Sequence, residues 1–119
     1  MGIDQTVMVI RGVVIPTPIT DEIKIRVDKR HWGVAGNTTS LWEWLQDEDA
    51  PEWLKCATDE ETDQSLIGEC LYQSPYVDGY AGSGMVPIQE SQHSAELETM
   101  LMAWGIREPV KTYVVVLWQ

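Results

Sequence analysis

Residues 6–15 read Thr-Val-Met-Val-Ile-Arg-Gly-Val-Val-Ile, and Pro16-Thr17-Pro18 follows directly. Seven of these ten residues are β-branched, and such side chains pack well on a pleated sheet. Proline has no N–H to donate to a neighbouring strand, so the strand should end there. The stretch therefore predicts a buried strand at the centre of a sheet. Gly12 marks a candidate bulge within it.

Four further stretches have the composition of strands. Residues 22–28 alternate apolar and polar side chains, which predicts a half-buried strand; a short helix from Thr20 or Asp21 is the alternative. Residues 65–72 predict another strand, and residues 85–88 a short strand at a sheet edge because of their proline. Residues 111–118 contain an uninterrupted apolar run. They predict a fully buried strand, which we place centrally beside the first.

The clearest helical pattern covers residues 91–104. Its apolar side chains recur at helical spacing and form one stripe: Leu97, Met100, Leu101 and Trp104. Either Ser91 or Ser94 is suited to cap the first turn, and Gly105 is suited to end the helix. We therefore expect one main helix with a single face packed on the sheet.

Two shorter helices are expected in the middle of the chain. Ser40 is suited to cap a helix over residues 41–46. The acidic residues 47–49 would lie at its carboxyl end, where the helix dipole disfavours anions, so the helix should stop there. Residues 49–54 place Pro51 near a first turn and predict a second short helix that finishes within residues 54–57.

These elements predict a fold of the α+β class. We expect a single domain over residues 1–119, built on a mostly antiparallel sheet of four or five strands. The longest apolar run is far shorter than the roughly 20 residues that span a bilayer, and no signal peptide is evident. Cys56 and Cys70 are not spaced as a metal or redox pair. We expect two reduced thiols and a cytoplasmic location.

The negative charge of the chain is concentrated in its middle. The net charge is −11, and residues 41–99 contain fourteen acidic residues but only one basic residue, Lys55. Direct binding of this segment to nucleic acid is not expected, because phosphate groups are held by Lys and Arg. No basic patch follows the first residues, Met1-Gly2, to supply a membrane signal, so membrane binding is not expected. A protein partner with a basic surface fits this charge better.

One acidic motif begins like a calcium-binding loop. Asp59, Glu61 and Asp63 alternate as the first three ligands of such a loop do. The sixth position should be glycine and is Gln64, and the twelfth should be glutamate and is Cys70. The motif therefore fails at both diagnostic positions, and we expect a solvated acidic loop without a metal.

No spacing in the chain predicts a catalytic site or a cofactor. His31 and His93 are isolated, so they do not form a zinc pattern with two distant cysteines. Ser83 has glycines directly beside it instead of two residues away on each side, unlike a nucleophile elbow. The Gly-rich residues 79–84 lack the lysine of a phosphate-binding loop. An enzyme using His31, Cys70 or Ser83 would need a convergence in space that the sequence does not show.

Aromatic residues lie among the carboxylates. Trp42 and Trp44 are two positions apart, about 200° around a helix, so they cannot both face one core. Either these tryptophans and Trp53 attach short helices to the sheet, or some of them anchor a partner. Tyr76 and Tyr80 lie on the Gly-rich loop and are candidate contacts, since tyrosines on such loops often serve recognition.

These features predict a small acidic interaction or inhibitor protein that presents a carboxylate-rich, Trp-containing face to a basic partner. The candidate partner-binding residues are Glu43, Trp44, Asp47, Glu48, Asp49, Glu52, Trp53, Asp59, Glu60, Glu61, Asp63, Tyr76 and Tyr80. Compact acidic chains without catalytic motifs resemble, in type only, phage-encoded inhibitors of host nucleases such as anti-CRISPR proteins. No family motif matches, so no residue roles follow from this resemblance. The alternatives are an oligomeric assembly or virion subunit, and a small ligand-binding domain or enzyme.

Overall fold

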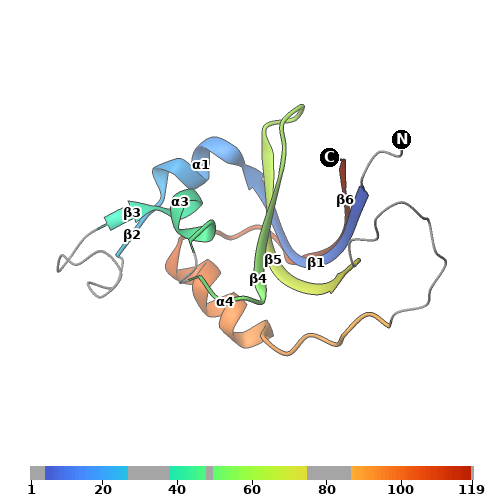
Figure 1. The fold of residues 1–119 in the computed structure, drawn as a ribbon. Coiled ribbons are helices and arrows are strands. Elements are labelled where there is room, and N and C mark those ends of the chain that lie inside the picture. The colour runs from blue at the N-terminus through green and yellow to red at the C-terminus, as the bar shows by residue number, and fades with distance from the viewer. Residues whose placement is uncertain (1–4, 27–37, 48–49, 75–86, 119) are drawn as a thin grey trace.

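Strand β1 (Gln5–Pro16) lies inside the main sheet and has a partner strand on each side (Figure 1). The computed structural model describes residues 5–26, 38–47, 50–74 and 87–118. On one side β1 pairs with β5 (Gln64–Gln73), which in turn pairs with β4 (Leu54–Asp59). On the other side it pairs with β6 (Lys111–Trp118). The order is β4-β5-β1-β6 and every pairing is antiparallel, as expected for this α+β fold.

Three helices and a small second sheet complete the described structure. Helix α1 (Thr17–Glu22) follows β1 directly. Strands β2 (Lys24–Arg26) and β3 (Thr38–Ser40) pair antiparallel, and helix α3 (Leu41–Leu45) follows β3. Helix α4 (Ser94–Ala103) is the longest of the three and packs against one face of the main sheet. None of these helices is long and apolar enough to cross a membrane.

The ends of α3 and α4 follow the local signals in the sequence. The Ser40 hydroxyl accepts a hydrogen bond of 3.2 Å from the Glu43 N–H, which confirms the expected cap of α3. Gly105 has a φ of +75°, a conformation that favours glycine, and it ends α4. The Ile106 N–H then donates to the Leu101 carbonyl at 2.9 Å, and both side chains are buried in the core. This arrangement is a Schellman motif.

Each face of the main sheet has its own apolar cluster. The main cluster lies between the sheet and the helices and is formed by Val13, Ile15, Leu41, Leu54, Ile67, Leu97, Leu101 and Ile106. The opposite face has a smaller cluster of Met8, Ile10 and Leu66, against which Val14, Ala57, Tyr113 and Val115 pack. In β1 the side chains at odd positions such as Val13 face the helices, and even ones such as Ile10 face away.

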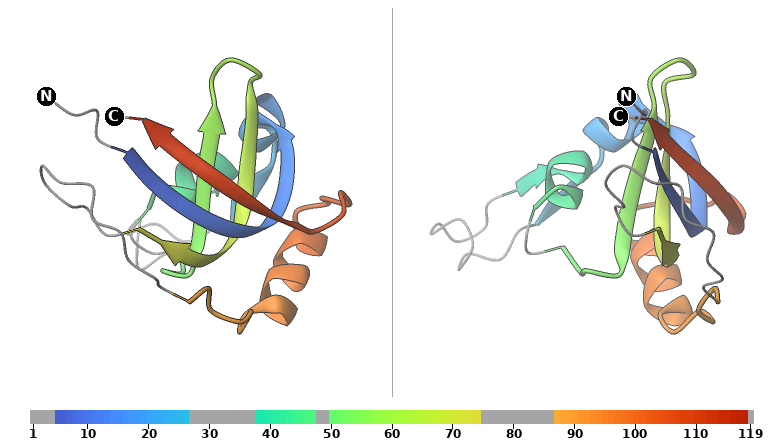
Figure 2. Two further views of the ribbon diagram at one scale, coloured as in Figure 1. Left: turned by 90° about the vertical axis from the view of Figure 1, so that its right-hand side faces the viewer. Right: turned by 45° about the vertical axis from the view of Figure 1, so that its right-hand side comes forward.

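The main sheet is strongly coiled, so that β6 crosses over β4 and β5 (Figure 2). A register shift between Val9 and Ile10 interrupts the β1–β5 pairing. The predicted bulge at Gly12 was therefore misplaced. Gly12 instead lies opposite Gly68, where a Cβ atom on either residue would collide with the backbone of the other strand.

The prediction of a second short helix over residues 49–54 was wrong. Residues 51–53 form a turn and β4 begins at Leu54. The segment is a strand because it pairs along its whole length with β5, from Leu54 opposite Glu69 to Asp59 opposite Gln64. Such pairing with a distant strand outweighs a weak local helix signal.

Placing residues 111–118 as a central, fully buried strand was also wrong. Strand β6 is at an edge of the sheet, and Val114 and Val116 are 70% and 40% exposed. Its Tyr113 and Val115 side chains do pack on the smaller cluster. The apolar run therefore covers one face of a coiled sheet while its other face remains open.

Two remaining predictions on the strands were partly correct. Of residues 22–28, Lys24–Arg26 form β2, and residues 27–28 lie outside the described residues. The alternative helix is also present but begins earlier, at Thr17. Of the strand expected at residues 85–88, Pro87 and Ile88 have no regular structure. Residues 85–86 lie outside the described residues.

Candidate functional site

A cleft of about 810 Å³ lies on the face of the main sheet that the helices leave uncovered. Both edge strands line it: residues 57–59 of β4 on one side and residues 113–116 of β6 on the other. Its floor is formed by residues 64–66 of β5 and by Val14 of β1. The two edges meet at one cleft because the sheet coils and brings β6 across β4 and β5 (Figure 2).

The cleft combines apolar and polar side chains, and one buried hydroxyl network lies at its floor. Val14, Ala57, Leu66, Tyr113 and Val115 supply the apolar surface. The fully buried Ser65 hydroxyl contacts the hydroxyls of Thr17 at 2.9 Å and Thr58 at 3.2 Å. These three groups satisfy one another, so the network stabilises the floor and leaves the cleft without a free buried polar group.

The turn between β4 and β5 supplies an acidic rim at one end of the cleft. Asp59, Glu60 and Glu61 are exposed and line it. The Asp59 carboxylate accepts the Glu61 N–H at 3.0 Å. No Lys or Arg of the described residues forms an ion pair with these carboxylates. The rim therefore presents uncompensated negative charge to solvent.

Asp63 completes this turn and holds it in place. It is exposed and has a φ of 56°, a left-handed conformation that Asp tolerates better than most residues. Its carbonyl accepts the Thr17 N–H at 2.9 Å, which ties the turn to the start of α1. The predicted acidic loop at residues 58–63 is thus a tight hairpin turn after the last residues of β4.

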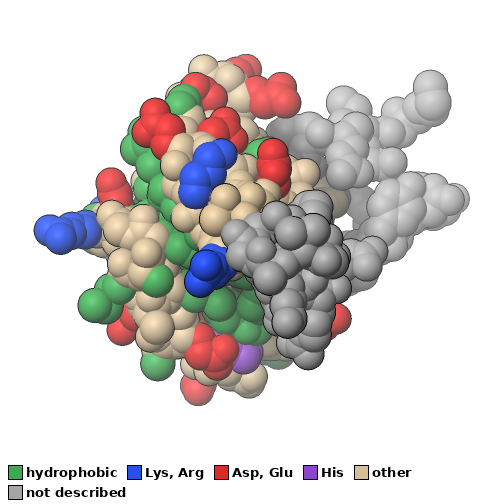
Figure 3. Space-filling model, turned by 90° about the vertical axis from the view of Figure 1, so that its left-hand side faces the viewer, with side chains coloured by type: hydrophobic (Ala, Val, Ile, Leu, Met, Phe, Trp, Pro, Cys, Tyr) green, Lys and Arg blue, Asp and Glu red, His purple; other side chains and the backbone are tan. Residues whose placement is uncertain are grey.

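The remaining described carboxylates among the predicted contacts lie at the other end of β4. Glu43 is on α3, where it accepts a hydrogen bond from the Thr39 hydroxyl at 2.5 Å, while Asp47 and Glu52 flank the connection to β4. Six residues of β4, about 17 Å of extended strand, separate them from the hairpin rim. In Figure 3 acidic side chains gather toward the upper end, where the β4–β5 turn lies, and others are scattered below. Glu48, Asp49, Tyr76 and Tyr80 lie outside the described residues.

The predicted tryptophan contacts are half-buried and pack on the main cluster. Trp44 meets Trp104 edge-to-face with ring centroids 5.9 Å apart, which joins α3 to α4. Trp53 is stacked on the His93 ring at 4.6 Å. Trp42 is also half-buried and lines a second hollow of about 630 Å³ beside Asp47 and Glu52.

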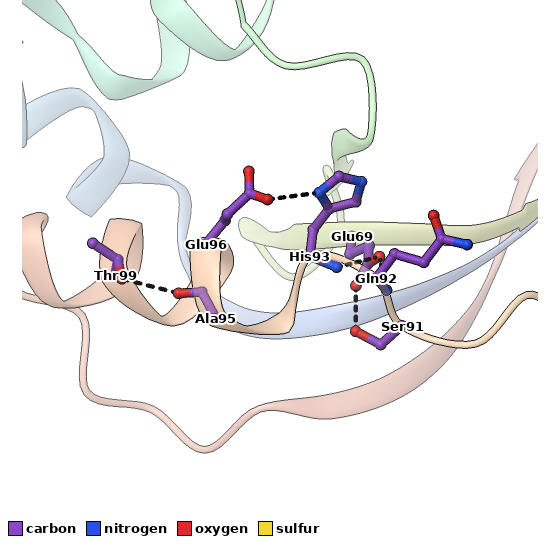
Figure 4. Close-up of polar contacts among 7 residues, drawn as sticks. All are labelled: Glu69, Ser91, Gln92, His93, Ala95, Glu96 and Thr99. Carbon is purple, nitrogen blue, oxygen red and sulfur yellow. Dashed lines mark hydrogen bonds and ion pairs between the residues drawn. The ribbon is translucent and has the colours of Figure 1, made fainter.

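The sequence did not suggest a role for Glu69, which is the most constrained carboxylate in the described structure. It lies on β5 and is only 3% exposed. It accepts hydrogen bonds from the Ser91 hydroxyl at 2.5 Å and from the backbone N–H groups of Gln92 at 2.9 Å and His93 at 3.1 Å (Figure 4). The predicted cap Ser91 therefore lies outside α4, which begins at Ser94.

The electrostatics of Glu69 indicate a structural role. Burial by itself raises the pKa of this carboxyl, but the three hydrogen bonds and the nearby His93 outweigh burial and hold the pKa below its ordinary value. The carboxylate is thus ionised, and both of its oxygens accept hydrogen bonds. It fixes the segment before α4, and the His93 ring is held by Trp53 and by Glu96 at 3.1 Å.

The Cys56 thiol is not activated as a nucleophile. Burial raises the pKa of the Cys56 thiol to about 12, which keeps it protonated and a poor nucleophile at neutral pH. The Cys70 sulfur contacts the Tyr72 carbonyl at 3.3 Å. No group of three or more His, Cys, Asp or Glu side chains in the described part of the chain could hold a metal ion. His31 and Ser83 lie outside that part.

Comparison of the chain with models of protein families, with curated proteins and with solved structures finds no match. The functional proposal therefore rests on the geometry and charge of the cleft.

Proposed function

We propose that this protein binds a partner protein in the cleft between β4 and β6 and thereby blocks a basic surface of that partner. The observation that carries the proposal is the position of three exposed carboxylates, Asp59, Glu60 and Glu61, at the end of a cleft lined by both apolar and polar side chains. No Lys or Arg among the described residues pairs with them. Exposed carboxylates beside a cleft are suited to steer and orient a basic partner surface.

The two parts of the cleft would contribute differently to binding. Burial of the half-buried apolar side chains of the cleft, Val14, Tyr113 and Val115, supplies affinity because water is released from them. The carboxylate rim supplies orientation and a faster approach of a basic partner, aided by the net charge of −11. The partner would present Lys or Arg beside an apolar segment.

We extend the proposal to the class of partner. Proteins that bind nucleic acids carry basic channels, and a dense set of carboxylates is suited to occupy such a channel in place of phosphate groups. An inhibitor of a host defence complex, of the type that phages encode, would act in this way. It would act in the cytoplasm, where such complexes work.

Charge reversal of the rim tests the proposal. A variant with Asp59, Glu60 and Glu61 all changed to Lys should lose a partner that the wild type captures from a lysate of the source organism. The matched control changes Glu90, Glu98 and Glu108 to Lys, three exposed residues that do not line the cleft. Both variants change the net charge equally, so only the control should keep the partner.

Repeating the capture experiment at increasing salt concentration provides a second test of the carboxylate rim. Binding to the wild type should weaken as salt rises, because exposed charges are screened over about 8 Å at physiological ionic strength. Capture that persists in the rim variant, or that does not change with salt, would show that the carboxylate rim does not recognise the partner.

A second candidate function is an assembly subunit. The exposed Val114 and Val116 on an edge strand favour it, because apolar edge strands promote pairing between copies. This candidate requires a stable homo-oligomer in light scattering that the rim variant leaves intact.

A further inference from the structure

The free edge of β6 indicates which structural element of the partner binds this protein. Within the described structure β6 pairs only with β1, so one row of its backbone N–H and C=O groups has no strand beside it. Residues 112–118 carry no charge, and only Lys111 at the start of the strand is basic. Proteins usually protect an exposed edge with charges, prolines or a covering segment.

This edge faces the cleft. Side chains in a strand alternate between the two faces of a sheet, so a surface beneath one face contacts every second residue. Four consecutive residues of β6, 113–116, line the cleft. Consecutive lining residues indicate that the main chain of β6 borders the cleft, with its side chains above and below.

The side chains on both faces of β6 are suited to a neighbouring strand. Tyr113 and Val115 point to the smaller apolar cluster, while Val114 and Val116 are exposed on the other face. A strand beside β6 would place cross-strand neighbours against both sets, and pairs of β-branched and aromatic residues stabilise such an arrangement.

The other edge of the sheet is less suited to a basic strand. β4 has six residues against eight in β6, so an added strand would form fewer main-chain hydrogen bonds there. The carboxyl end of β6 lies toward the same end of the molecule as the β4–β5 turn (Figure 1). A strand added to β6 would therefore have one of its ends near Asp59, Glu60 and Glu61.

We infer that the partner contributes an extended segment that adds to β6 as an antiparallel strand, with apolar residues over the cleft and Lys or Arg at its amino-terminal end beside the acidic turn. This inference rests on the proposed function and specifies the partner element. The antiparallel direction is chosen because such pairing is slightly more stable per residue than parallel pairing. Main-chain hydrogen bonds would supply affinity and the acidic turn would set direction.

Synthetic peptides test this inference directly. The probe is a peptide of about ten residues with two lysines at its amino terminus followed by alternating Val and Thr, matching a typical strand length. A peptide of the same composition with the lysines at its carboxyl terminus tests the direction. Two further versions of the first peptide carry N-methyl groups on alternate backbone nitrogens, one version at odd positions and the other at even positions. Each version therefore lacks the N–H hydrogen-bond donors along one edge of the peptide only.

The expected result is binding of the first peptide, with weaker binding of the version that has carboxyl-terminal lysines. One N-methylated version should lose about tenfold or more in affinity, a difference of about 1.4 kcal/mol, and the other should keep most of it. Hydrogen exchange should slow at alternate amides of residues 112–118, the ones that do not face β1.

Four outcomes would overturn strand addition at β6. Two of them come from the binding measurement: no binding up to millimolar peptide, and equal binding of both N-methylated versions. The other two come from hydrogen exchange: slower exchange on β4 instead of β6 when peptide is added, and slower exchange on β6 when the protein concentration alone is raised. The last would mean that a second copy occupies the edge. Failure of the proposed function would look different. The variant with Asp59, Glu60 and Glu61 changed to Lys would then capture the natural partner as well as the wild type does.

Discussion

Gly12 on β1 and Gly68 on β5 lie directly opposite each other, and their backbones approach so closely that neither position has room for a side chain. A Cβ on Gly12 would meet the Ile67 carbonyl oxygen, and one on Gly68 would meet the Arg11 carbonyl oxygen. The pair lies within the part of β1 that joins both halves of the coiled sheet. We attribute the close passage of the two strands to this pair.

Substitution of Gly68 by Ala should destabilise the fold. The added methyl group forces two backbones apart in a well-packed sheet, which we expect to lower the free energy of unfolding by about 1–3 kcal/mol. Urea unfolding followed by tryptophan fluorescence measures the loss. Ala95→Ser, at an exposed position of α4, is the control and should stay within about 0.5 kcal/mol of wild type. Equal stability of both variants would contradict the close approach.

Glu69 should make stability depend on pH in the acidic range. Because its folded pKa is lowered, the unfolded chain binds the proton more tightly, so the contribution is present above the ordinary pKa of about 4.3 and is lost as pH falls through the folded pKa. Glu69→Gln should cost about 1–3 kcal/mol at neutral pH. The difference between wild type and variant, measured by urea unfolding, should shrink below about pH 4. A difference that stays constant to low pH would show that the carboxylate is not preferentially ionised in the folded state.

Trp44 and Trp104 should be energetically coupled across α3 and α4. Their edge-to-face contact predicts a coupling free energy of about 0.5–1.5 kcal/mol in a double-mutant cycle with Trp44→Ala and Trp104→Ala. Thermal or urea unfolding of the four proteins provides the cycle. Strict additivity of the two losses would mean that Trp44 does not hold α3 to α4.

Cys56 should react slowly with alkylating reagents in the native protein. A pKa raised by burial to about 12 leaves very little thiolate at pH 8, so the rate should be roughly a hundredfold or more below that of the unfolded chain. Mass spectrometry after timed iodoacetamide treatment, with and without urea, measures both rates at this residue. Similar rates in the two conditions would contradict the burial of the thiol.

Local sequence signals predicted several elements correctly. The β-branched run of β1, the apolar stripe of α4, the Ser40 cap and the Gly105 stop are all present, and the α+β class with a four-stranded antiparallel sheet is confirmed. The β1 run, the α4 stripe, the Ser40 cap and the Gly105 stop depend on interactions between residues close in the chain. Such interactions are fixed by side-chain shape, capping chemistry and backbone preference.

The tertiary structure alone decided where the strands lie and what the acidic residues face. Residues 54–59 form a strand because they pair with the side of β5 that does not face β1. β6 is an edge strand because β1 is its only partner among the described strands. The acidic middle was visible in the sequence, but the coiled sheet places Asp59, Glu60 and Glu61 at the cleft and leaves Glu43 and Glu52 at the other end of β4. Glu69 is buried and holds the segment before α4 through its hydrogen bonds with Ser91, Gln92 and His93. These outcomes depend on pairing between distant segments, whose energies no local pattern contains.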